Sequence, residues 1–93
     1  MTIEEFKSSL NAAKPGKMSV YLESLWYDRK GNWEKSHQII QDIDDNTAAW
    51  IHAYLHRKEG DTGNADYWYK RAGKKRPAAT LDEEWEELIN FLL

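Results

Sequence analysis

The chain has 93 residues, a formal net charge of −3 and no cysteine. This length predicts one domain, and an apolar fraction of 41% is too high for a disordered chain. The lack of cysteine excludes disulfides and thiol chemistry. The negative charge argues against nucleic acid or an anionic membrane as a partner. Because no membrane-length apolar stretch and no basic leader are found, we expect a cytoplasmic protein.

The first predicted element is a helix within residues 1–14. Thr2 and Glu5 have the spacing of a capping box, in which each side chain bonds the backbone N–H of the other residue. Pro15 then ends the segment, because proline disfavours helical geometry in the residue before it.

Two helical hairpins are predicted next, over residues 18–44 and 46–77. In each hairpin a glycine separates two segments of helical apolar spacing, Gly31 in the first and Gly60 in the second. The turn of the second hairpin is expected to span residues 60–63. The helix after it has apolar residues at positions i, i+3, i+4 and i+7, namely Ala65, Trp68, Tyr69 and Ala72.

The last predicted helix spans residues 80–93. Thr80 and Glu83 repeat the capping-box spacing. One face of this helix is apolar and consists of Leu81, Trp85, Leu88, Ile89 and Leu92. We expect this helix to cover the end of the preceding stack.

The two hairpins are related by an internal repeat with an offset of 29 residues, which places Gly31 on Gly60. Small residues then coincide with small ones, as Ser24 does with Ala53, and large apolar residues coincide with large ones. Such self-similarity is typical of stacked helical units, which bury their apolar faces against each other.

Over residues 18–77 the chain resembles the tetratricopeptide (TPR) family and its Sel-type relatives. The TPR pattern has a small residue in its first helix, a turn, a small residue and a large aromatic in its second helix, and then a proline. The second hairpin matches it at Ala53, Gly60, Ala65, Tyr69, Ala72 and Pro77. The first hairpin matches at Ser24, Tyr27, Gly31, Ser36 and Ile40. The 29-residue offset is shorter than the ~34 residues of a TPR.

The predicted fold is therefore all-α and forms a single helical-repeat domain over residues 1–93. It has five to six helices, arranged as two stacked TPR-like hairpins with a flanking N-terminal helix and a C-terminal capping helix.

The resemblance implies a non-catalytic protein- or peptide-binding module, because TPR arrays bind partners on the first helices of their hairpins. The partner-binding candidates that it implies are Tyr21, Leu25, Arg29, Trp50, Tyr54, Arg57 and Lys58. Their aromatic rings would supply contact area and their cations would select acidic groups. Two alternatives remain open: the terminal helices cover several of these residues, or the partner is a second copy in a homodimer.

A different class of function is suggested by His52 and His56, which lie one helical turn apart with Glu59 close behind. Imidazoles at this spacing can bind zinc, and the only other histidine that could add a ligand is His37. The alternative is therefore a small metal- or ligand-binding helical protein. Because these positions are packing positions of the repeat, the prediction is a packing role, with no metal and no cofactor.

A basic run near the end of the second hairpin consists of Lys70, Arg71, Lys74, Lys75 and Arg76. We interpret it as a solvated helix end, where cations complement the helix dipole. The acidic start of the next helix should pair with part of it, so no nucleic-acid site is predicted. No nucleophile is spaced to meet an oriented base, and we therefore predict that the chain is not an enzyme.

Overall fold

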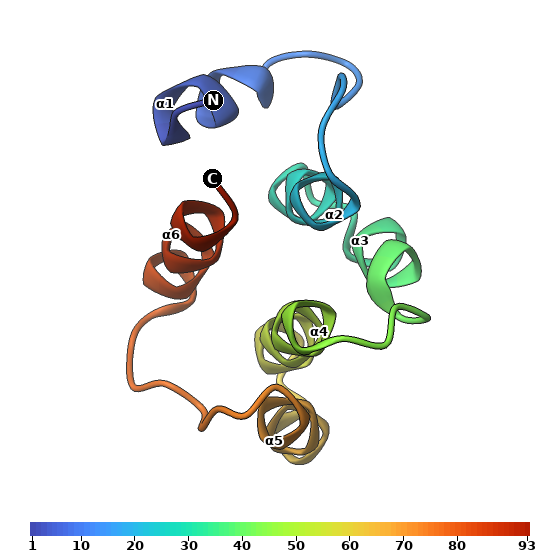
Figure 1. Cartoon of the computed structure of the whole chain (residues 1–93), viewed down its shortest axis with the longest axis vertical. Coiled ribbons are helices and arrows are strands. Elements are labelled where there is room, and N and C mark those ends of the chain that lie inside the picture. The colour runs from blue at the N-terminus through green and yellow to red at the C-terminus, as the bar shows by residue number, and fades with distance from the viewer.

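The computed structural model describes all 93 residues and contains six helices and no strand (Figure 1). The helices are α1 (Ile3–Ser9), α2 (Val20–Arg29), α3 (Trp33–Ile40), α4 (Asn46–Lys58), α5 (Thr62–Arg71) and α6 (Leu81–Leu92). The all-α prediction is confirmed. None of the six is long and apolar enough to cross a lipid bilayer.

Helices α1 to α5 follow one another round an arc, and α6 returns to the side that the arc leaves open (Figure 1). Within the arc, α2 packs on α3, α3 on α4, and α4 on α5. Helix α6 packs on α2 and α4. It therefore lies along the first helices of the two predicted hairpins, whereas we expected it to cover the end of the stack.

The helices begin where a side chain caps the helix N-terminus. Both capping boxes are present: the N–H of Glu5 donates to Thr2 Oγ1 at 3.1 Å, and the N–H of Glu83 donates to Thr80 Oγ1 at 3.1 Å. The turn predicted over residues 60–63 is shorter in the structure, because Asp61 caps α5 and the helix begins at Thr62.

The bends at Gly31 and Gly60 are equivalent, as the repeat predicted. Each glycine has φ +86°, a left-handed conformation that favours glycine. The N–H of the residue after each glycine donates to a carbonyl five residues back. Asn32 donates to the carbonyl of Tyr27 at 2.8 Å, and Asp61 donates to that of His56 at 2.9 Å. Asn32 and Asp61 also cap the following helix. Each bend is a Schellman motif that ends one helix and starts the next within three residues.

Helix α4 is the central element of the core. Every residue from Ala48 to His56 is buried, because α2, α3, α5 and α6 all pack around this helix. Helix α6 contributes Trp85, Leu88 and Ile89 from the apolar face that was predicted for it. The ring of Phe6 in α1 lies 5.8 Å from that of Trp85, which joins the N-terminal helix to the same core.

The backbone conformations of Gly31 and Gly63 predict opposite effects for two Gly→Ala substitutions. Gly31→Ala should lower the free energy of unfolding by about 1–2 kcal/mol, because a Cβ is strained at this φ although nothing lies within 4 Å of it. Gly63→Ala, inside α5 and equally unobstructed, should raise it by about 0.5–1 kcal/mol. Urea unfolding followed by circular dichroism measures both, and equal effects would show that the left-handed conformation of Gly31 does not matter for stability.

Candidate functional site

Three of the seven predicted partner-binding side chains lie inside the core. Leu25, Trp50 and Tyr54 are 0%, 5% and 1% exposed. The indole N–H of Trp50 donates to Glu84 Oε2 at 3.1 Å, and the Tyr54 hydroxyl donates to Asp28 Oδ2 at 2.8 Å. The predicted groove is therefore filled by the chain itself.

The other four predicted residues bind carboxylates of the same chain. Tyr21 donates to Asp45, Arg29 pairs with Asp82, Arg57 with Glu84, and Lys58 with Asp28. The guanidinium of Arg29 also lies 4.1 Å from the centre of the Trp85 ring. The acidic groups that we expected from a partner are thus supplied largely by α2 and α6, and this agrees with the alternative in which a terminal helix covers the face.

Glu84 is the centre of this covered face, and only 1% of its surface is exposed. It accepts hydrogen bonds from Arg57 at 2.8 Å, from the Tyr69 hydroxyl at 2.7 Å and from Trp50. Burial raises the pKa of Tyr69, and the Glu84 carboxylate raises it further, so the hydroxyl keeps its proton and donates it. This role could not be predicted from the sequence, because Glu84 is one of five acidic residues within residues 82–87.

The basic run does not pair with α6. Arg71 pairs with Asp44 at 3.3 Å and Arg76 with Asp66 at 3.4 Å, and no ion pair joins the run to the acidic start of α6. Its three lysines, Lys70, Lys74 and Lys75, make no ion pair and no side-chain hydrogen bond. The predicted pairing with α6 is therefore wrong, and these cations are free to meet a ligand.

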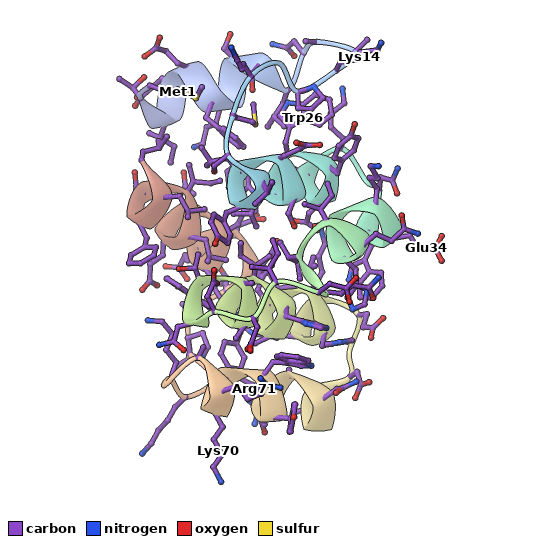
Figure 2. All side chains as sticks on the ribbon, turned by 45° about the vertical axis from the view of Figure 1, so that its right-hand side comes forward. Met1, Lys14, Trp26, Glu34, Lys70 and Arg71 are labelled. Atoms are coloured by element: carbon purple, nitrogen blue, oxygen red, sulfur yellow. The ribbon has the colours of Figure 1, made fainter.

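These lysines surround an open hollow of about 660 Å³, which we call the lysine hollow. Its lining consists of Asp66, Tyr69, Lys70, Gly73, Lys74, Lys75 and Arg76. A second hollow of about 260 Å³ shares Tyr69, Lys74 and Lys75 with it, and the rest of its lining is Trp50, Pro77, Glu84 and Glu87. Lys74 Nζ lies 4.0 Å from the centre of the Trp50 ring. Figure 2 shows Lys70 extending from α5 away from the body of the molecule.

A second cluster brings together all three histidines of the chain. Nε2 of His37 in α3 lies 2.9 Å from Nε2 of His52 in α4. His56, one turn further along α4, contacts Glu59 Oε1 through Nδ1 at 2.8 Å. One ring nitrogen from each histidine lies within 4.8 Å of one from each of the others. The sequence indicated that His52 and His56 lie together on one helix. It did not indicate that His37 contacts them, because that contact depends on how α3 packs.

Two tryptophans hold the histidine rings in place. The ring of Trp33 stacks on His37 at 4.9 Å, and the ring of Trp68 stacks on His52 at 3.9 Å. Trp33 is itself fixed, because its N–H donates to the carbonyl of Leu55 at 2.8 Å. The helical spacing placed Trp68 on an apolar face but could not show that it packs against an imidazole.

The neutral form of the imidazole is favoured at His52 and His37. Burial and, after it, the neighbouring His37 lower the pKa of His52 to about 4. Burial also lowers the pKa of His37. Neutral imidazoles have a free ring-nitrogen lone pair, which a hydrogen-bond donor or a metal can use.

Compared with protein-family models, curated proteins and solved structures, the chain matches none of them.

The buried carboxylate predicts a large stability difference between two glutamates of α6. Glu84→Ala should lower the free energy of unfolding by about 3–5 kcal/mol, because Arg57 would lose its buried partner. Glu87→Ala removes an equal charge from an exposed position and should change it by less than about 0.5 kcal/mol. Urea unfolding of both variants tests this, and similar losses would show that Glu84 does not hold α6 in place.

Proposed function

We propose that the chain is a non-catalytic protein-binding module of the TPR-like helical-repeat kind, which acts in the cytoplasm and holds an acidic segment of another protein. Support for the repeat comes from the two Schellman bends, which coincide at an offset of 29 residues in conformation, hydrogen bonds and caps. The observation that carries the binding role is the lysine hollow, whose three lysines lack an acidic partner in the chain.

Because α6 covers the predicted groove, the proposed contact surface differs from the one that the TPR resemblance implies. In the TPR resemblance a partner lies along α2 and α4, but here α6 packs on both of these helices. The lysine hollow lies at the end of α5 and the start of the following loop, beyond this covered face. Among the residues predicted from the resemblance, Trp50 remains next to it, through the second hollow.

The chemistry of the lysine hollow fits an acidic segment, and the neighbouring aromatic rings fit an apolar side chain on that segment. Lys70, Lys74 and Lys75 supply positive charge without a competing salt bridge, and Tyr69 forms part of the floor. Close by, Phe91 is 62% exposed and its ring lies 5.4 Å from that of Trp50. Complementary charge would steer the partner, and the aromatic rings would provide contact area.

Charge reversal in the hollow tests the proposal. Acidic peptides selected from a random peptide library on the intact chain should bind the Lys74→Glu/Lys75→Glu variant at least tenfold more weakly, because attraction becomes repulsion. Fluorescence anisotropy measures the dissociation constants. Binding to the unchanged chain should also weaken as salt is added, because the lysines are exposed.

The matched control is Lys14→Glu/Lys17→Glu, which changes the charge equally at two exposed residues that do not line the hollow. Figure 2 shows Lys14 at the opposite end of the molecule from Lys70. This variant should bind the selected peptides as the unchanged chain does. Selection of neutral or basic peptides, preference for RNA, or equal losses in both variants would contradict the proposal. Self-association that only the Lys74/Lys75 variant abolishes would identify a second copy of the chain as the occupant instead.

A further inference from the structure

The histidine cluster has features that simple packing does not require. The three imidazoles come from two helices that belong to different predicted hairpins, and they present ring nitrogens to one another. Apolar side chains would fill the same space without the cost of removing polar nitrogens from water. The only carboxylate that bonds one of them, Glu59, does so on a single nitrogen of His56.

Glu59 sets the orientation of His56. An ionised carboxylate can only accept, so the proton of His56 lies on Nδ1 and is donated to Oε1. In the neutral form of the ring, Nε2 of His56 then keeps its lone pair. In metal sites a ligating histidine usually donates its other N–H to a carboxylate or carbonyl in this way, which fixes the tautomer and raises the basicity of the ligating nitrogen.

His37 and His52 face each other through the same type of nitrogen. Their Nε2 atoms lie 2.9 Å apart, a hydrogen-bond distance at which one neutral ring donates to the other. A tetrahedral zinc ion with Zn–N bonds of about 2.0–2.1 Å holds its nitrogens about 3.3 Å apart. The two Nε2 atoms would have to move slightly apart, and the donated proton would move to Nδ1 of the same ring. Both Nε2 lone pairs could then face one ion, and no proton would be released.

The geometry points to a binding site for a divalent transition-metal ion, best suited to Zn²⁺, in which His37, His52 and His56 are the ligands and Glu59 is a positioning residue. Neutral imidazole is a ligand for zinc, copper and nickel, whereas calcium and magnesium prefer oxygen. Three histidines leave one position of a tetrahedral ion open to water or to a fourth ligand. The stacked rings of Trp33 and Trp68 hold two of the three ligands in place.

The site would join the two helix pairs. His37 belongs to α3, whereas His52 and His56 belong to α4. A bound ion would therefore link the first pair, α2–α3, to the second pair, α4–α5, and should stabilise the folded chain by binding it in preference to the unfolded one. The cluster shares no residue with the lysine hollow, so the two proposals can fail independently.

The test uses the full chain, prepared without a histidine tag and treated with a chelator. Because His37, His52 and His56 are the only histidines, nuclear magnetic resonance can follow all the imidazoles of the chain at once. Titration with ZnCl₂ should shift the ring signals of all three, saturate at one ion per chain and raise the melting temperature by several degrees. Co²⁺ bound in place of Zn²⁺ should show the visible absorption of a four-coordinate ion.

Single substitutions separate ligands from bystanders. His37→Ala, at the half-buried position, should weaken Zn²⁺ binding at least 100-fold, and His52→Ala should do the same. Glu59→Gln keeps an acceptor for His56 but removes the charge, and it should weaken binding about 10–100-fold. The control is Gln38→Ala, which lies next to His37 on the exposed side of α3 and should leave the affinity unchanged.

Two of the outcomes that would overturn the site concern the unchanged chain and do not depend on how well a variant folds. If ZnCl₂ leaves any of the three imidazole signals of the unchanged chain unaffected at saturation, that histidine is not a ligand. A lack of saturable binding would show that the cluster is only packed. Equal Zn²⁺ affinity in the unchanged chain and in a folded His37→Ala variant would overturn the site as well.

Discussion

The buried carboxylate of Glu84 is the interaction on which the position of α6 depends. A charge in the core is costly unless it is paired and hydrogen-bonded, and here Arg57, Trp50 and Tyr69 all donate to it. All three donors lie on α4 and α5, so the carboxylate can be satisfied only where α6 meets those helices. Apolar packing of Leu88 and Ile89 would tolerate a shift along the face, but the hydrogen bonds would not. Glu84 thus fixes the register of α6 and, with it, closes the face that the TPR resemblance leaves open.

Helix α4 contacts different neighbours on its two opposite sides. At 3.6 residues per turn, Trp50, Tyr54 and Arg57 fall on one side, whereas His52 and His56 fall on the other. The first side receives α6 and the Asp28 carboxylate of α2. The second side receives His37 from α3 and Trp68 from α5. The nine consecutive buried residues of α4 follow from this arrangement, since no side of the helix from Ala48 to His56 faces water.

The features that sequence reasoning predicted correctly are local. The capping boxes need residues three apart, and the bends at Gly31 and Gly60 need only the six residues around each glycine. The features that it missed depend on segments distant in sequence. Glu84 looks like its acidic neighbours until α6 has docked, and His37 lies 15 residues from the imidazole that it contacts. The lysines were expected to pair with the nearest acidic run, but the arginines found carboxylates elsewhere and left the lysines free.

The helix pair α2–α3 contacts the pair α4–α5 mainly through α3 and α4. Contacts on both sides of α4 strengthen this interface. On one side the first pair reaches the second through Asp28, which accepts from Tyr54 at 2.8 Å and from Lys58 at 2.8 Å, and α6 spans both pairs. On the other side the links are two uncharged hydrogen bonds, one from Trp33 to the carbonyl of Leu55 at 2.8 Å and one between His37 and His52 at 2.9 Å. An ionic contact thus connects the pairs on the α6 side, while the opposite side has the Trp33 bond and the three imidazoles. An ion bound to them would supply on that side a link comparable to the one that the buried carboxylates supply on the other.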